Sequence, residues 1–209
     1  MAQSRRSTRS RKSTRARSRR NGEGSDAISL LKADHDQVKK WFGEFEKARS
    51  DSRKQELAQK ICMALKAHTI IEEEIFYPAF LEATEEKDIH HEAEVEHEGA
   101  KKLIEEIEAA GPDDDYFDAR VSVLSEMIKH HVNEEEKRGG MFAKARNSEM
   151  DLESLGEQLK QRKQEVMQGE GASMSGAREE STSNRRGRGK IAALLGRDGK
   201  GRDARNRAG

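Results

Sequence analysis

Apolar residues recur every three or four positions from about residue 26 to residue 167, which is the spacing of one face of an α-helix. Alternation with a period of two, which a half-buried β-strand would need, does not extend over a useful length. Start and stop signals divide this region into segments. The sequence therefore predicts helices at about 26–49, 51–83, 84–111, 113–138 and 148–167.

Residues that cap helix N-termini stand at the beginning of several of these segments. Asp26, Ser50 and Thr84 precede the first three, and Ser148 with Asp151 forms a capping box for the fifth. Four long helices joined by short connections predict an all-α fold, an antiparallel four-helix bundle. The fifth helix carries enough apolar residues on one side to lie against that bundle.

Two further positions should interrupt regular helix. Pro78 lies near the end of the second segment and should kink it, because proline lacks a backbone N–H and its ring crowds the preceding turn. The pair Gly139-Gly140 should break the fourth helix.

Each of the four long apolar stripes contains a histidine at a similar depth. His68–Glu72 and His131–Glu135 have the i,i+4 spacing that places both side chains on one helix face. The inward-facing polar residues are His35, His68, Glu72, His97, His131 and Glu135. Buried charges are almost never tolerated unless they are paired or bound to metal. We therefore predict that these six residues are metal ligands.

The chemistry of the six donors restricts the metal. Imidazole and carboxylate without sulfur suit iron, manganese or zinc. Six donors are more than one tetrahedral zinc ion needs, so two ions that share the carboxylates fit better. The set is richer in histidine than the carboxylate sites of ferritin-like bundles.

Composition separates the acidic middle of the chain from two basic ends. Of 209 residues, 33% are hydrophobic and 38% are charged, and the formal net charge is zero. Residues 1–22 contain nine Lys/Arg and no acid, and residues 172–209 contain ten Lys/Arg and four acids. We predict that residues 26–167 form one domain, that 1–25 is a disordered Arg/Ser-rich tail, and that 168–209 is a disordered Gly/Arg-rich tail.

Several classes of protein are excluded by the same reading. The sequence has no run of about 18 apolar residues that could span a membrane, and its first residues lack the apolar segment of a secretory signal. Cys62 is the only cysteine, so no disulfide framework is expected. The predicted location is the cytoplasm.

Four segments in order resemble the hemerythrin-like, HHE cation-binding family over roughly residues 26–167. They read LLKADHDQVKKWF, LKAHTIIEEEIFYPAF, EVEHEGAKKLI and HHVNEEEKRGGMF. The resemblance implies a four-helix bundle around a non-haem di-iron centre. It implies that the six residues named above are iron ligands, with Glu72 and Glu135 as bridging carboxylates beside an oxo or hydroxo bridge.

One position departs from the family pattern. Respiratory hemerythrins have a histidine one turn before the ligand that corresponds to His97, and this chain has Ala93 there. The ion concerned would then take Glu94, keep a water molecule, or be held less tightly. We interpret His90 as a residue near an exposed helix end, rather than a ligand, and Tyr77 as a packing residue. Glu73 and Glu136 are interpreted as solvated, with competition of Glu136 for the position of Glu135 as the alternative.

The resemblance implies a protein that binds or senses a small ligand, O2 or NO, or that buffers iron under stress. A dedicated oxygen carrier is disfavoured by the departure at Ala93. A redox enzyme of ferroxidase or peroxidase-like type at the same centre is the alternative, and no substrate-pocket motif favours it. A further alternative is association with nucleic acid through residues 1–25 and 172–209, because clustered Lys/Arg residues bind phosphates by counterion release.

Overall fold

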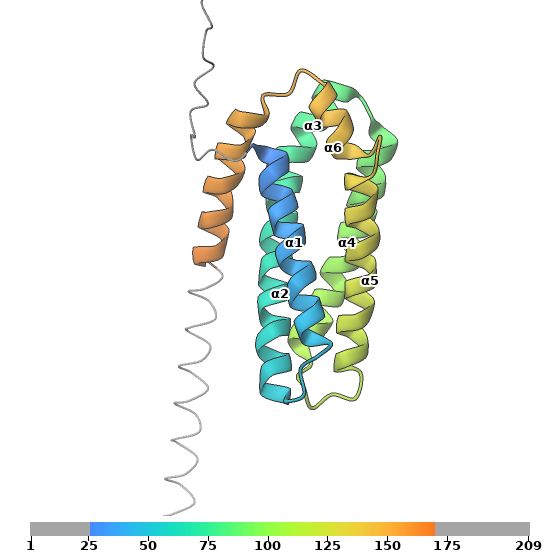
Figure 1. Ribbon diagram of the computed structural model, residues 1–209, viewed down its shortest axis with the longest axis vertical. Helices are drawn as coiled ribbons and strands as arrows, with labels where there is room; N and C mark the ends of the chain where they lie inside the picture. The colour runs from blue at the N-terminus through green and yellow to red at the C-terminus, as the bar shows by residue number, and fades with distance from the viewer. Residues whose placement is uncertain (1–25, 170–209) are drawn as a thin grey trace, which may run out of the picture.

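Four long helices lie side by side in the computed structural model, which describes residues 26–169 (Figure 1). The predictions for residues 1–25 and 170–209 lie outside the described residues. In chain order the named helices are α1 (Ala27–Phe45), α2 (Asp51–Ile71), the π-helix η1 (Glu72–Phe76), α3 (Tyr77–Thr84), α4 (Lys87–Ala109), α5 (Phe117–Glu136) and α6 (Met141–Asn147). A last helix spans residues 152–169, so residues 168 and 169 continue this helix.

The long helices form a closed antiparallel arrangement. α1 contacts α2 and α5, and α4 also contacts α2 and α5, so each helix has two neighbours around the bundle. The short connections lie at the two ends of the bundle (Figure 1). No strand occurs in residues 26–169. The predicted all-α bundle is confirmed.

The second predicted helix is continuous but locally widened. α2 passes without a break into η1 and then α3, and Tyr77 N–H donates to the carbonyl of Glu72, which is the i→i+5 bond of a π-turn. Pro78 follows directly, and its ring disfavours regular α-helical geometry in the turn before it. The disturbance expected at Pro78 therefore takes the form of a π-turn that starts at Glu72.

Two predicted helix starts are wrong. Thr84 ends α3, where its hydroxyl donates to the Phe80 carbonyl, and Glu85 then adopts a left-handed conformation with φ of 58°. Ser148 ends the short helix α6, which the sequence analysis missed, and Asp151 alone accepts a bond from the last helix. A side chain that can cap an N-terminus can equally close the preceding helix, so sequence does not separate the two roles.

The apolar interior is divided into two clusters along the bundle axis. One cluster packs the half of the bundle near the α1–α2 connection and includes Phe42, Leu57 and Ile104. The other packs the half near α3 and α6 and includes Ile28 and Phe80. α1, α2 and α4 cross from one cluster to the other, whereas α5 packs in the first cluster and α6 supplies the second. The polar residues described below lie at the boundary.

The last helix packs on the outside of the bundle near α1 and α2 (Figure 1). Leu159 is fully buried, which confirms that its apolar side faces the bundle. Arg162 binds the Glu74 carboxylate through two nitrogens at 2.6 and 3.0 Å, and Lys163 pairs with Asp34. None of the helices in residues 26–169 has the length and apolar character needed to cross a membrane.

Candidate metal centre

The four long helices and η1 bring all six predicted ligands into one buried layer. None is more than 6% exposed: the members are His35, His68, Glu72, His97, His131 and Glu135. The layer separates the two apolar clusters. Apolar residues on both sides of the histidine fix its depth in α1, α2 and α4. In α5 the buried residues Phe117, Val121 and Leu124 lead up to His131 at the same level.

The four imidazoles form two pairs. His35 Nε2 lies 3.0 Å from His68 Nε2, and His97 Nε2 lies 3.2 Å from His131 Nε2. One pair belongs to the α1–α2 side of the bundle and the other to the α4–α5 side. We call them the α1–α2 pair and the α4–α5 pair.

Each glutamate reaches one histidine of each pair. Glu72 Oε2 lies 3.2 Å from His68 Nε2 and 3.4 Å from His97 Nε2. Glu135 Oε2 lies 3.4 Å from the Nε2 atom of His35 in the first pair and 3.6 Å from that of His131 in the second. Both carboxylates therefore span the two pairs, as expected of ligands shared between two cations.

The outward-facing nitrogen of every histidine contacts a carboxylate from a neighbouring helix. The Nδ1 contacts are His68 to Asp34 at 3.4 Å, His97 to Glu73 at 3.0 Å, His131 to Glu96 at 2.8 Å, and His35 to Glu136 at 2.9 Å. The contacts run from α1 to α2, from η1 to α4, from α4 to α5 and from α5 back to α1. We call these four carboxylates the outer ring. Such contacts orient metal-binding histidines and leave Nε2 free for the metal.

Glu73 and Glu136 were interpreted as solvated, and this is wrong. Both are partly buried and hydrogen-bond the imidazoles of the layer. The sequence held a signal that could have found the outer ring, because each member is the chain neighbour of a predicted ligand. The sequence did not show that each outer-ring carboxylate contacts a histidine of the neighbouring helix, and not the histidine of the helix that carries the carboxylate.

The protonation of the layer in the absence of metal follows from its charges. Burial opposes the charged form of His68, but the Glu72 carboxylate and the hydrogen bond to Asp34 outweigh it and raise the His68 pKa to about 10. Burial likewise opposes the charged form of His97, but its bonds to Glu72 and Glu73 raise its pKa to about 9. Near neutral pH both imidazoles hold an extra proton when no metal is bound.

His35 behaves in the opposite way. Burial, together with repulsion from the charged His68, lowers the His35 pKa to about 4. His35 is therefore neutral, and its Nε2 accepts a hydrogen bond from His68 Nε2–H while its Nδ1–H donates to Glu136. The α1–α2 pair thus shares one proton between two atoms that would both face a metal.

The two glutamates are not equivalent in charge. Burial alone would raise the pKa of Glu72, but the charged His68 and His97 hold it well below its usual value. Burial and repulsion from Glu72 raise the pKa of Glu135. Two carboxylates in one buried layer repel each other, so a cation placed between them would remove this repulsion.

The residues fit a metal centre by a direct structural criterion. Glu72 Oε1 and Glu135 Oε2 are fully shielded from solvent and make no hydrogen bond among residues 26–169. An unpaired buried carboxylate oxygen is costly, and metal coordination is one way to satisfy it. The donor atoms also form two groups, His35–His68–Glu72 and Glu72–His97–His131, whose members lie within 4.8 Å of one another.

Tyr77 was interpreted as a packing residue, and this is confirmed, but its hydroxyl also reaches the polar layer. It does pack in the core, with 1% exposure, but its hydroxyl lies 3.2 Å from His97 Nε2 and donates to Glu135 Oε1 at 3.2 Å. Burial and the two nearby glutamates raise the Tyr77 pKa well above its usual value, so the hydroxyl keeps its proton. Tyr77 thus supplies an oxygen on the α4–α5 side of the layer.

The region around Ala93 settles one of the alternatives left open by the sequence. The Glu94 side chain is 52% exposed and faces His90 at 3.5 Å, so it does not complete the layer. Ala93 is buried and lines a small cavity of about 90 Å³ together with His131 and Glu135. His90 packs edge-on against Tyr77 and is partly buried, so it is less exposed than a frayed helix end.

The end of α5 is shaped by two glycines, as predicted. Gly139 has φ of +84°, which favours glycine, and a Cβ on Gly140 would lie 2.3 Å from the Glu134 carbonyl oxygen. The chain can therefore turn sharply after Glu136 and begin α6. This turn places the Phe142 ring in a stack on His35, with centroids 5.8 Å apart and an interplanar angle of 8°.

Comparisons with known proteins agree with this fold. The crystal structure of a hemerythrin HHE cation-binding domain-containing protein from Mycobacterium kansasii matches with a TM-score of 0.58 at 20% identity, over 69% of this chain and 88% of that one, which supports the fold. A DNA nickase from Nostoc sp. (strain PCC 7120) is 31% identical over 162 residues. That match covers 74% of this chain and 45% of the relative, so the chain spans less than half the length of that curated protein. The model of the hemerythrin HHE cation-binding domain matches residues 26–143, and the chain therefore belongs to this family of metal-binding helical bundles.

Proposed function

We propose that the protein holds two non-haem iron ions in this layer. One observation carries the proposal: each of the two carboxylates lies near one Nε2 atom of the α1–α2 pair and one Nε2 atom of the α4–α5 pair. One ion would be held by the α1–α2 pair and the other by the α4–α5 pair, with Glu72 and Glu135 shared. Nitrogen and oxygen donors of this kind suit ferrous and ferric ions.

The role that we propose for this centre is to bind or sense a small diatomic ligand, O2 or NO, or to buffer iron. A ferrous pair would supply reducing electrons and an open coordination position. The cavity beside Ala93 adjoins His131 and Glu135, and its volume of about 90 Å³ suits a diatomic molecule better than an organic substrate. The Tyr77 hydroxyl keeps a proton on the same side and donates it in a hydrogen bond to Glu135.

Metal analysis and optical spectra test this proposal. Protein produced with abundant iron should contain close to two irons per chain, and a variant with Glu72→Ala should contain almost none. His91→Ala, at an exposed position of α4, is the matched control and should keep both irons. Spectra of the anaerobically reduced protein, recorded before and after addition of air or NO, should then show a ligand-dependent band in the wild-type protein and in His91→Ala, but not in Glu72→Ala.

Different results separate the alternatives. Protein that contains no iron, and that is equally stable after chelation, would contradict the proposal. Repeated oxidation of added ferrous ion, followed by stopped-flow absorbance, would instead indicate the redox enzyme, whereas uptake of a fixed amount without turnover supports a binding role.

A second candidate function is contact with DNA through the basic segments 1–25 and 172–209. Two observations favour it: the segments are rich in Arg and Lys, and a relative at 31% identity is a DNA nickase. Binding to duplex DNA should weaken steeply with salt, and replacement of the nine Lys/Arg of residues 1–22 by Gln should reduce both the affinity and the salt dependence. Salt-independent binding, or none, would contradict this candidate. Nicking of supercoiled plasmid by the wild-type protein, but not by Glu72→Ala, would connect the DNA contact to the metal centre.

A further inference from the structure

Each outer-ring carboxylate uses its second oxygen to contact a basic side chain at the surface of the bundle. The four pairs are Glu73 with Lys101 at 2.8 Å, Glu136 with Lys32 at 2.6 Å, Glu96 with His130 at 3.1 Å, and Asp34 with Lys163. The other oxygen contacts the Nδ1 atom of a histidine in the buried layer. Every histidine of the layer is therefore joined, through one carboxylate, to a basic group outside the layer.

Three of these basic side chains come from the bundle itself, and one does not. The three lie on α1, α4 and α5, the long helices that also carry histidines of the layer. Lys163 lies on the last helix, 129 positions along the chain from Asp34 and outside residues 26–143 that match the family model. The last helix therefore supplies a contact to the outer ring that the four long helices do not supply.

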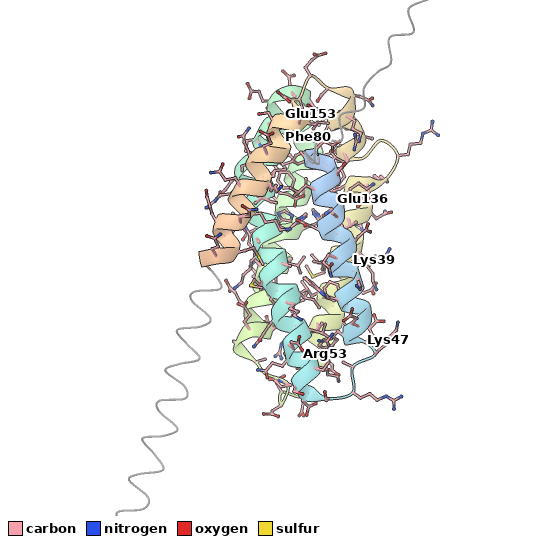
Figure 2. All side chains as sticks on the ribbon, turned by 60° about the vertical axis from the view of Figure 1, so that its left-hand side comes forward. Lys39, Lys47, Arg53, Phe80, Glu136 and Glu153 are labelled. Atoms are coloured by element: carbon pink, nitrogen blue, oxygen red, sulfur yellow. The ribbon has the colours of Figure 1, made fainter. Side chains whose placement is uncertain are left out.

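The packing of the last helix directs Lys163 toward the bundle. Leu155, Leu159 and Lys163 follow one another at intervals of four residues, so they share one face of the helix. Leu155 is 9% exposed and Leu159 is fully buried. Figure 2 shows this helix, on which Glu153 is labelled, beside α1 and α2, as in Figure 1. Lys163 therefore continues the face that packs on the bundle.

Asp34 lies where it can affect both histidines of the α1–α2 pair. It is the chain neighbour of His35 on α1, and its Oδ2 atom lies 3.4 Å from His68 Nδ1. This is the longest of the four outer-ring contacts, so the imidazole restrains this carboxylate less than in the other three. The side chains of Asp34 and Lys163 are only 15% and 28% exposed, and water screens such a pair less than one at the open surface. The pairing with Lys163 therefore contributes strongly to the position of the Asp34 carboxylate.

We propose that Lys163 is a positioning residue for the metal centre: through Asp34 it holds the His68 imidazole in the orientation that binds an ion at the α1–α2 pair. This inference rests on the proposed function. Loss of a group that orients a metal-binding histidine weakens metal binding by about 10- to 100-fold, and Lys163 acts one contact farther out. Because the coupling between two sites is reciprocal, an ion at the α1–α2 pair should in turn strengthen the docking of the last helix.

Anaerobic titration of the metal-free full chain with Co2+, whose visible absorption depends on its ligands, tests the proposal. The wild-type chain should bind two ions, and Lys163→Gln should weaken one of them about tenfold while the other is unchanged. Lys163→Arg keeps the positive charge and should restore most of the affinity. Two variants of the same helix serve as controls and should change both affinities less than about twofold. They are Lys160→Gln, at an exposed position, and Arg162→Gln, which removes the ion pair with Glu74 but not the contact with Asp34.

A double variant separates positioning through Asp34 from a general effect of the last helix. In a chain that already carries Asp34→Asn, Lys163→Gln should weaken Co2+ binding no further, because the lysine acts through that carboxylate. Additive effects of the two changes would overturn the proposal, because they would show that Lys163 acts by another route. Equal weakening by Arg162→Gln and Lys163→Gln would also overturn it, because loss of helix docking would then account for both.

Hydrogen exchange supplies a measurement that does not depend on the absorption of the metal. Backbone amides of residues 152–169 should exchange more slowly in the wild-type chain with Co2+ than without it, and this difference should be much smaller in Lys163→Gln. A wild-type chain that binds no Co2+ would overturn the proposed function and this inference with it. A wild-type chain that binds two ions, but whose last helix exchanges at the same rate with and without them, would overturn this inference alone.

Discussion

The two histidine pairs carry the same donors and share the same carboxylates, yet their surroundings differ. On the α1–α2 side, the Phe142 ring covers His35, and a groove of about 410 Å³ ends beside it. On the α4–α5 side, the Tyr77 hydroxyl lies 3.2 Å from His97 Nε2, and a cavity of only about 90 Å³ lies beside Ala93. The ligand set is therefore nearly symmetric, whereas access to it is not.

This difference shows that the donors alone do not decide which molecules reach a metal centre. Small residues and cavity size control access, and a hydroxyl or an aromatic ring next to a donor controls what can bind there. In this protein the α4–α5 side suits a diatomic ligand, and the α1–α2 side adjoins space for a larger molecule. The predictions below test whether the two sides are coupled through the shared carboxylates or act separately.

The largest effect is expected from Glu72→Ala. Because Glu72 reaches both pairs, its loss should remove metal from both sides and lower the affinity by more than about 100-fold. His35→Ala or His131→Ala should affect mainly the side that each belongs to. Metal content measured by mass spectrometry, with competition by a chelator, checks this order. If Glu72→Ala and His35→Ala lose the same single ion, Glu72 is not shared.

The next largest effect concerns pH. His68 and His97, one on each side, have pKa values raised to about 10 and about 9, and both must lose a proton before a metal binds. Metal affinity should therefore rise steeply between pH 7 and 9, by up to about tenfold per pH unit for each proton that is displaced.

The stability of the metal-free protein should change in the opposite direction. A raised pKa stabilises the fold fully below the ordinary histidine value of 6.5, and this stabilisation is lost as pH rises through about 9 and 10. Urea unfolding of the metal-free protein at pH 6.5 and pH 10 should show a loss of a few kcal/mol, at about 1.4 kcal/mol per pKa unit. A pH-independent midpoint in this range would refute the proposed protonation.

One-sided effects are expected from the outer ring. Glu136→Gln should weaken binding at the α1–α2 side, and Glu96→Gln at the α4–α5 side, each by about 10- to 100-fold. Spectroscopic titration with metal should then resolve one strong and one weak site in each variant. Glu98→Gln, at an exposed position of α4, serves as a control. Equal weakening of both sites by either variant would indicate that the two sides are strongly coupled.

The smallest effect should come from Tyr77→Phe. This change removes one buried hydrogen bond to Glu135 and should lower the free energy of unfolding of the metal-free protein by about 1 kcal/mol. Ligand binding on the α4–α5 side should change while metal content does not. Tyr116→Phe, at an exposed tyrosine, should change neither quantity. Loss of metal in Tyr77→Phe would show that the hydroxyl contributes to holding the ion.

The bundle and the common depth of the six residues could both be predicted from the sequence. Both follow from the spacing of apolar residues every three or four positions. Glu72 and Glu135 each lie one turn from a histidine on the same helix, so local spacing was sufficient to orient them. The outer ring could not be predicted in this way, because Glu73 and Glu136 contact histidines of other helices. Their contacts depend on how neighbouring helices are rotated, which the spacing of one helix does not contain.

The hydroxyl contacts of Tyr77 and the short helix α6 escaped prediction for local reasons. In a regular α-helix, the residue that stacks on Glu72 is Phe76, four positions later. The π-turn moves this position to the fifth residue, so Tyr77 takes it. α6 has only seven residues, too few to show a clear apolar stripe, and it forms because the glycine turn before it directs Phe142 onto His35.

The outer ring also has a mechanical consequence. Its four contacts pass around the bundle in one rotational sense, each joining a carboxylate on one helix to an imidazole on the next. A shift of any single helix along its axis by one residue, about 1.5 Å, would stretch two of these contacts at once, the one it gives and the one it receives. The outer ring therefore couples the axial positions of the four long helices. Binding of metal by the histidines should restrict these positions, and a shift of any long helix should weaken metal binding.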